Sequence, residues 1–325
     1  MKQNEWMLAA AAAAVVQMTW AQDAHAQKYP LKTIRFIVPY APGGSTDFLA
    51  RMVGQKFNEA WKQQVIVDNR AGAGGIVGAD LAAKSAPDGY TIVLTAMSHA
   101  TAIGFHKKMP YSLTGDLDGV SLIATQPNAI AVHPSLPART LKEFIALARA
   151  KPGELAYSSS GIGSTQHVMG EYFRVQAKIS TIHVGYKGTA PALQDLISGQ
   201  VSFSFQPVIN AIPSAQSGRI RVLAVTGGKR SAAAPEIPTM AEAGLPQYSV
   251  SSWYGVHIPA KTPAAITAQL SREINRALAQ DDIKQRLTSL GMEPAANSPE
   301  EFSAFVASEV ARWTKLIQDA GLKAE

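Results

Sequence analysis

One stretch near the N-terminus, IRFIVPYAPGGSTD at residues 34–47, indicates the fold, and the rest of the chain repeats its pattern. It begins with an apolar run rich in β-branched residues, which predicts a buried strand over residues 33–39. Gly43 and Gly44 then break the chain, and apolar residues recurring on one side of residues 46–62 predict a helix. The stretch is therefore a strand–loop–helix unit with a glycine-rich loop.

The same alternation of apolar runs and amphipathic stretches continues to the C-terminus. It predicts a mostly parallel sheet, because strand–helix–strand units place their strands side by side. Two such α/β lobes, joined by chain crossings near residues 125–129 and 249–253, would leave a cleft at their interface. Further strands are expected at 64–67, 91–95, 119–124, 128–133, 155–158, 181–184, 201–205, 221–226 and 253–258. Helices are expected at 76–84, 141–150, 165–176, 263–280 and 299–320, and between the strands at 181–184, 201–205 and 221–226, with capping boxes at Thr140/Glu143, Thr239/Glu242 and Ser298/Glu301.

Composition excludes several classes of protein. The 325 residues are enough for about two domains. Charged residues make up 17%, against about 25% in a typical domain, which argues against disorder and against a coiled coil. There is no cysteine, so disulfides, thiolate metal sites and cysteine nucleophiles are excluded. The net charge of +6 favours anionic ligands, but lysines and arginines are scattered, so nucleic-acid binding is not expected.

Residues 1–26 predict a secretory signal peptide. Lys2 supplies a positive start, an alanine-rich apolar stretch covers residues 6–19, and residues 24–26 match the small-x-small cleavage pattern, which places the cut before Gln27. An uncleaved anchor or an ordinary helix is the alternative, although the apolar stretch is short for a membrane span. We therefore expect export to the periplasm.

Three glycine-rich breaks, at residues 40–47, 158–165 and 185–191, each lie between an expected strand and an expected helix. A helix N-terminus presents unpaired N–H groups and a partial positive charge, and glycine lets a ligand approach that backbone. Neighbouring serine and threonine hydroxyls can donate to a carboxylate. One such break is more often only a turn and a helix cap, but three of them in two lobes indicate a shared anion site.

No catalytic residue, metal site or cofactor is predicted. A fourth break at residues 72–78 resembles a dinucleotide fingerprint, but it follows the second strand and lacks an acidic partner, so a structural turn is favoured. There is no Gly-x-Ser-x-Gly elbow and no paired histidine spacing for a metal. His167 is expected to pack locally rather than to serve Ser160 as a base. Asp47 is expected to interact with its helix dipole and, secondarily, with the glycine loop.

Five motifs together resemble the Bug-type substrate-binding proteins of tripartite tricarboxylate transporters. They lie at residues 34–47, 67–75 with 87–91, 160–167, 186–192 and 238–246, and the likeness covers nearly all of the chain after residue 26. The resemblance implies a two-lobed α/β periplasmic binding protein of type II, a Venus flytrap with two chain crossings. Lobe 1 would comprise residues 27–127 and 250–325, and lobe 2 residues 128–249.

The resemblance also implies a function and a site. A small carboxylate would bind between the lobes of a monomer that is not an enzyme, and would be delivered to membrane permease subunits. A receptor that presents its ligand to a membrane sensor, or an enzyme acting on such acids, is the alternative. The ligand-binding residues carried over are Tyr40, Ala41, Gly43, Gly44, Ser45, Thr46 and Ser98 from lobe 1, and Ser160, Gly163, Ser164, Thr165, Lys187, Gly188, Thr189 and Gln206 from lobe 2.

Three positions depart from the family pattern. Gln206 stands where an aspartate is frequent, residues 102–106 replace an Asn-Pro-x-Leu-Tyr stretch, and Gly185 replaces a proline. Without the aspartate, a buried ligand ammonium would lack a counter-charge. The hypothesis is therefore a ligand without an amino group, a simple mono- or dicarboxylic acid, aliphatic or aromatic. Trp253, on the return crossing, is a further candidate to reach the cleft.

Overall fold

The computed structural model describes residues 29–106, 108–319 and 321, so the predicted signal peptide at residues 1–26 lies outside the described part. In chain order the elements are β1 (Ile34–Val38), α2 (Ser45–Trp61), β2 (Val65–Asn69), a 3-10 turn (Ala73–Gly75), α3 (Ile76–Ala83), β3 (Thr91–Ala96), α4 (Met97–Phe105), β4 (Leu117–Val132), α5 (Leu141–Ala150), β5 (Ala156–Ser159), α6 (Thr165–Ala177), β6 (Ile182–Gly185), α7 (Thr189–Ile197), β7 (Phe203–Pro207), α8 (Val208–Gln216), β8 (Arg221–Val225), β9 (Ser251–Pro259), α9 (Ala264–Leu278), α10 (Asp281–Ser289), β10 (Glu293–Pro294) and α11 (Pro299–Asp319).

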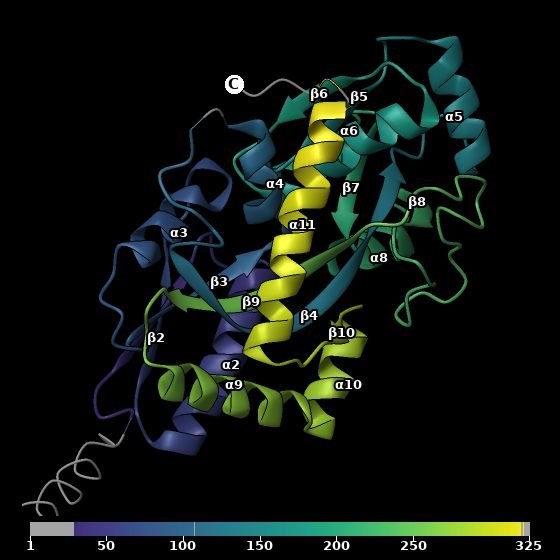
Figure 1. Ribbon diagram of the computed structural model, residues 1–325. Coiled ribbons are helices and arrows are strands. Elements are labelled where there is room, and N and C mark those ends of the chain that lie inside the picture. Colours follow the sequence, from purple (N-terminus) through teal and green to yellow (C-terminus); the bar gives the residue numbers. More distant parts are fainter. Residues whose placement is uncertain (1–28, 107, 320, 322–325) are drawn as a thin grey trace, which may run out of the picture.

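One long strand, β4, takes part in two sheets. Its residues 117–127 pair with β9, and its residues 128–132 pair with β7. The first sheet therefore contains β2, β1, β3, β9 and the start of β4, with β10 alongside, and the second contains the end of β4 with β7, β8, β5 and β6. Figure 1 shows β4 running from one sheet to the other, with helices packed around both. The chain returns to the first sheet through β9.

The prediction of a mostly parallel sheet is wrong for the middle of this arrangement. Strands within strand–helix–strand units are parallel, namely β1 with β2 and β3, and β5 with β6 and β7. The pairs that β4 and β9 make with each other and with β3, β7, β8 and β10 are antiparallel. The physical reason is that β4 and β9 carry the chain between the sheets in opposite directions, so no right-handed crossover helix connects them.

The expected strands at 119–124 and 128–133 are one continuous strand, β4. Pro127 lies inside it, at the position where β4 changes partner from β9 to β7. A proline is tolerated there because the ladder is interrupted and the missing N–H leaves no partner unsatisfied. Two helices, α4 and α10, form where the sequence pattern gave no helix.

Two of the three capping boxes begin helices as predicted. At α5, Thr140 Oγ1 accepts from the Glu143 N–H at 3.2 Å, and at α11 Ser298 Oγ accepts from the Glu301 N–H at 3.1 Å. The box at Thr239 and Glu242 also forms its hydrogen bonds, but only a turn follows. Gly244 with φ +105° and Pro246 two residues later end that turn before it can lengthen.

Helix α11 connects the two sheets from outside (Figure 1). Its Glu309 carboxylate accepts from the indole N–H of Trp253 in β9 at 3.1 Å and from that of Trp313 at 3.0 Å. Trp253 is 1% exposed and faces this helix, so the suggestion that it reaches the cleft is wrong. Tyr172 of α6 also packs edge-on against Trp313, with ring centroids 6.1 Å apart. No helix in the described residues is long and apolar enough to span a bilayer.

Candidate functional site

The predicted site residues gather at the carboxyl ends of the two sets of parallel strands. Strands β1, β2 and β3 end together, and the segments after them (residues 39–44, 70–75 and 97–99) form what we call the first edge. Strands β5, β6 and β7 likewise end together, and residues 160–164, 186–188 and 206–207 form the second edge. Ligands of open α/β sheets bind at such edges, because loops and helix N-termini meet there.

The two edges meet beside α4. Thr101 Oγ1 lies 3.4 Å from the carbonyl oxygen of Gly163, and the ring of Phe105 lies 4.9 Å from that of His167. A Cβ placed on Gly74 would lie 3.4 Å from the carbonyl oxygen of Ile162. The loop at residues 161–163 therefore touches the first edge, and the space between the edges is closed on this side.

The glycine loop of the first edge is anchored by Asp47. Its carboxylate accepts from the Gly43 N–H at 3.1 Å, from Arg51 at 3.0 Å and from Asn69 Nδ2 at 3.1 Å. Burial raises the pKa of Asp47, but the hydrogen bonds and the charge of Arg51 outweigh it, so the pKa lies below its ordinary value. Both expected roles of Asp47 are confirmed, since it lies in the first turn of α2 and contacts the loop.

The start of α2 is open to a ligand. Its N-cap is Gly44, which has no side chain to cap the helix, and residues 41–44 are exposed. Ser45 Oγ donates to Gln126 Oε1 at 3.1 Å, and the Tyr254 hydroxyl donates to the same atom at 3.1 Å. Gln126 lies on β4 and Tyr254 on β9, so the loop is tied to both crossing strands. Sequence reasoning missed both residues, because neither lies in a recognisable motif.

Tyr40 and Ser98 bind each other. Their hydroxyls form a hydrogen bond, and the Tyr40 hydroxyl also lies 3.3 Å from the carbonyl oxygen of Gly74. Burial raises the pKa of Tyr40, so its phenol stays protonated and can donate. Ser98 is 2% exposed, so its hydroxyl is buried against Tyr40. Thr46 is also buried, whereas Ala41, Gly43 and Gly44 face outward.

Gln166 organises the second edge. Its Oε1 accepts from the Ser160 N–H at 2.9 Å, and its Nε2 lies 3.5 Å from Thr189 Oγ1. Ser164 is the N-cap of α6, and its hydroxyl oxygen accepts from the His167 N–H at 3.3 Å, a bond that leaves its proton available to donate. Helix α7 begins after Gly188, which has φ +133° and no side-chain cap. The remaining predicted residues here, Gly163, Thr165 and Lys187, are buried, half-buried and exposed respectively.

Gln206 is fully buried near the end of β7. Its Nε2 donates to Ser204 Oγ at 2.9 Å, and Ser204 Oγ donates to the Ser158 carbonyl oxygen at 2.9 Å. Its Oε1 has no hydrogen-bond partner among the described residues. A buried acceptor without a donor is rare in proteins, and it often marks a position that a ligand or water completes.

Three of the described histidines make hydrogen bonds within the fold, and His167 packs locally as predicted. His167 Nδ1 accepts from the Gly163 N–H at 3.1 Å, and His257 Nδ1 lies 2.7 Å from Thr95 Oγ1. His183 bonds with Ser159 Oγ at 2.6 Å, and its ring lies 4.2 Å from that of His167. Within residues 29–106, 108–319 and 321, no three or more His, Asp or Glu side chains are grouped to hold a metal ion.

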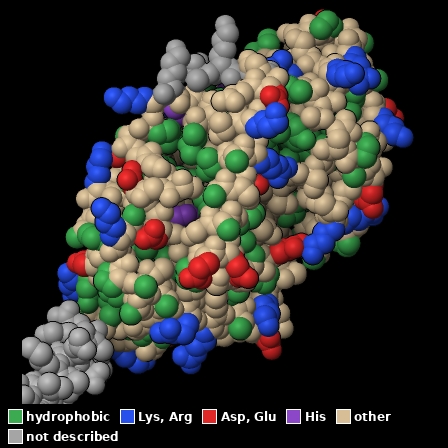
Figure 2. All heavy atoms as spheres, viewed as in Figure 1, with side chains coloured by type: hydrophobic (Ala, Val, Ile, Leu, Met, Phe, Trp, Pro, Cys, Tyr) green, Lys and Arg blue, Asp and Glu red, His purple; other side chains and the backbone are tan. Residues whose placement is uncertain are grey.

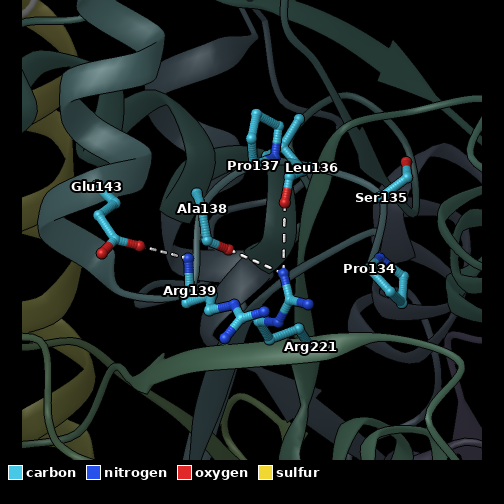
Figure 3. Close-up of a pocket in the computed structure, with 8 residues that line it drawn as sticks. All are labelled: Pro134, Ser135, Leu136, Pro137, Ala138, Arg139, Glu143 and Arg221. Carbon is cyan, nitrogen blue, oxygen red and sulfur yellow. Dashed lines mark hydrogen bonds between the residues drawn. The ribbon is translucent and has the colours of Figure 1, made fainter.

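A surface pocket of about 410 Å³ lies away from both edges, beside the start of α5 (Figure 3). The guanidinium of Arg221 there donates to the carbonyl oxygens of Leu136 and Ala138 at 3.3 and 3.0 Å. This cation is therefore already engaged by the backbone. None of the predicted ligand-binding residues lines this pocket.

Comparisons with known proteins identify the family. Residues 49–322 match the description "Tripartite tricarboxylate transporter family receptor". A solved structure of R. palustris Rpa4515 with adipate is 36% identical, has a TM-score of 0.87, and covers 91% of this chain and 100% of its own. The structure of the periplasmic binding protein BugD is 30% identical, with a TM-score of 0.84, and the match covers 91% of this chain and 100% of BugD. The structure of MatC from Rhodopseudomonas palustris with bound malate is 30% identical, with a TM-score of 0.82, and the match covers 89% of this chain and 100% of MatC.

These relatives confirm the predicted α/β binding-protein fold and the expectation of a binding protein rather than an enzyme. Solved members of the family carry carboxylates, namely adipate and malate. The chain belongs to the receptor family of the tripartite tricarboxylate transporters, the TctC or Bug family of periplasmic binding proteins.

Proposed function

We propose that this protein is an extracytoplasmic solute receptor that binds one small carboxylate between two lobes and delivers it to membrane permease subunits of a tripartite tricarboxylate-type transporter. The lobes are residues 27–127 with 250–325, and residues 128–249. The observation that carries the proposal is that the first and second edges come together beside α4, where Gly74 of the first edge approaches Ile162 of the second and Thr101 Oγ1 contacts the Gly163 carbonyl oxygen. A ligand between those edges touches loops of both lobes at once.

The chemistry of the two edges suits a carboxylate. Helices α2 and α7 start at Gly44 and Gly188, whose backbones a ligand oxygen can approach closely. Hydroxyls of Ser160 and Thr189 and the ammonium of Lys187 add donors around those helix starts. On the face shown in Figure 2, basic side chains are scattered among acidic ones, so anion capture depends on these local donors rather than on a basic patch.

The crossing strands supply a hinge for closure. β4 and β9 pair through residues 117–127 and 251–259, and the chain leaves one sheet for the other just beyond this ladder. Asn128 Nδ2 donates to Ser252 Oγ at 2.7 Å, and the Asn128 N–H donates to Thr226 Oγ1 at 3.0 Å. These bonds link the strands at the crossing, so relative motion of the lobes concentrates in few residues.

A thermal-shift screen tests the binding claim. The chain from Gln27 onward is heated with mono- and dicarboxylates, aliphatic and aromatic, because a ligand of the folded state raises stability as ln(1 + [L]/Kd). A dose-dependent rise in Tm with at least one carboxylate, and none with the matching amide, is the expected result. A screen in which no carboxylate shifts Tm contradicts the proposal.

Export and delivery have their own tests. Mass spectrometry of protein from the periplasm should give a chain beginning at Gln27 if the signal peptide is cleaved as predicted. Cells lacking the protein should lose uptake of the labelled acid identified in the screen. Retention of full uptake, together with loss of a transcriptional response to the acid, would identify the sensor role instead.

A further inference from the structure

A chain of hydrogen bonds fixes the amide of Gln206 in one orientation. Ser204 has a single hydroxyl proton, and it is directed at the Ser158 carbonyl oxygen, 2.9 Å away. Ser204 Oγ can therefore only accept from Gln206, so the amide must present Nε2 to it, also at 2.9 Å. The Oε1 atom of Gln206 is then directed to the other side of the amide.

That other side is the second edge. Ser204 precedes Gln206 by two residues on β7, so both side chains lie on the same face and Nε2 points back along the strand. Oε1 consequently lies on the side of the amide away from Ser204, and Gln206 itself belongs to the second edge at the end of β7. The residue is fully buried, and its Oε1 is unpartnered within the described residues. An acceptor in this position requires a donor, which a second ligand carboxylate cannot supply.

The nearby charges exclude an ammonium as that donor. The segments of both edges contain no acidic residue, and Asp47 beside the first is already engaged by Arg51, Asn69 and Gly43. Asp195 on α7 accepts a hydrogen bond from the Tyr186 hydroxyl at 2.5 Å. A buried ammonium facing only the neutral Gln206 amide would lack a compensating charge. A neutral hydroxyl satisfies Oε1 without that cost.

We propose that Gln206 selects for a hydroxyl group on the bound acid, so that the preferred ligands of this receptor are hydroxycarboxylates. Ser204 is the positioning residue that keeps Oε1 facing the ligand. This inference rests on the proposed function, because it assumes that a carboxylate binds between the two edges.

The test compares acids that differ by one hydroxyl. Calorimetry measures the affinities for malate and succinate, for 2-hydroxyglutarate and glutarate, and for 4-hydroxybenzoate and benzoate. In the pair that fits the site, the hydroxy acid should bind roughly tenfold more tightly or better, because its analogue leaves Oε1 unpaired. Equal affinities within every pair that binds would overturn the inference, including the case in which water satisfies Oε1.

Variants assign the preference to Gln206. Gln206→Met removes the acceptor and keeps the length of the side chain, so the ratio of affinities within a pair should fall toward one. Ser204→Ala lets the amide rotate and should also reduce the ratio, which keeps the test usable if Gln206→Met does not fold. The control Gln166→Met changes a glutamine beside the same edge whose Oε1 already has a partner. It should weaken the binding of both acids in a pair and leave the ratio of their affinities unchanged.

The outcomes separate this inference from the proposed function. If no carboxylate of any kind binds, the proposed function fails and the inference fails with it. If carboxylates bind but Gln206→Met leaves the ratio unchanged, only the role of Gln206 is overturned.

Discussion

The ring of Phe105 lies against the imidazole of His167, with centroids 4.9 Å apart and planes inclined by 48°. Phe105 ends α4 beside the first edge, and His167 lies in the first turn of α6 at the second edge. Both are almost completely buried, at 2% and 8% exposure. The two edges are therefore packed together here, which is the arrangement expected of a closed binding protein.

Phe105→Leu should weaken closure. The shorter side chain loses much of its contact with His167, so the lobes should separate more readily in the absence of ligand. We expect a larger radius of gyration by small-angle scattering without ligand, a return to the compact value at saturation, and an affinity reduced several-fold. Phe305→Leu on α11, where Phe305 packs on Trp253, is the control and should leave the radius unchanged. An unaltered radius in Phe105→Leu would show that this contact does not govern closure.

Acidification should destabilise the protein through His167. Desolvation, together with the nearby His183, lowers the pKa of His167 from 6.5 to about 4. Below pH 6.5 the unfolded chain therefore binds a proton at this histidine, whereas the folded chain binds it only below about pH 4. The contribution of His167 to the unfolding free energy is fully present above pH 6.5 and is lost as the pH falls from 6.5 to about 4. The slope is at most about 1.4 kcal/mol per pH unit for one group.

Urea unfolding at pH 7 and pH 5 measures this effect. His167→Gln keeps an acceptor for the Gly163 N–H but does not titrate, so it should lose less stability between these pH values than the wild type. The stability of His167→Gln should still depend on pH to some extent, since burial also lowers the pKa values of His99 to about 4 and of His257 to about 3. Identical losses in the two proteins would be evidence that His167 is not neutral and buried as described.

Asp47→Ala should loosen the glycine loop. The change removes the acceptor of the Gly43 N–H, Arg51 and Asn69 together, and each loses a hydrogen bond to a charged group. We expect a loss of about 1–3 kcal/mol in unfolding free energy and a larger fractional loss of carboxylate affinity. Asp47→Asn retains one acceptor oxygen, so its stability and its carboxylate affinity should lie between those of the wild type and those of Asp47→Ala. Unchanged affinity in Asp47→Ala would mean that the loop needs no anchoring.

Glu309→Gln should destabilise the fold without a direct effect on the ligand. Both indole N–H groups donate to the same carboxylate oxygen, Oε2, and Arg312 donates to Oε1. An amide can keep its oxygen on the two indoles only by turning its NH2 group toward the Arg312 guanidinium, and the indole bonds then lose their charged acceptor. A loss of about 1–3 kcal/mol is expected in denaturant unfolding. Glu300→Gln, at an exposed position of the same helix, is the matched control. Equal stability of the two variants would remove Glu309 from the account of how α11 is fixed.

Much of the fold could be predicted from the sequence because local signals agree with the final structure. The apolar run of β1, the glycine break and the amphipathic α2 are each set by residues close together in the chain. The capping boxes at Thr140 and Ser298 likewise act over three residues. The antiparallel centre could not be predicted, because the direction of β4 and β9 depends on how the chain crosses between sheets.

The loops that form the candidate site could be predicted from the sequence, but the side-chain contacts that hold those loops in place could not. Motifs located the segments of the two edges, whereas Gln126 and Tyr254 lie outside every motif and become recognisable only through their hydrogen bonds. Gln166 lies inside the motif at residues 160–167, but its role as the organiser of the second edge follows only from its contact with Ser160. Gln206 was singled out by its departure from the family pattern. Its fixed amide orientation follows from Ser204 and Ser158, which lie on different strands.

The most direct test of the central claim is a calorimetric titration of Gly44→Val with the acid that stabilises the wild-type protein. At Gly44 φ is −91°, and a Cβ placed there meets no atom within 4 Å, so valine should leave the fold intact, with only the small loss of stability that valine causes at a helix N-cap. Its side chain covers the start of α2, where a ligand oxygen must reach the backbone. The account predicts an affinity at least about tenfold weaker. Wild-type affinity in a folded Gly44→Val would contradict carboxylate capture at this edge.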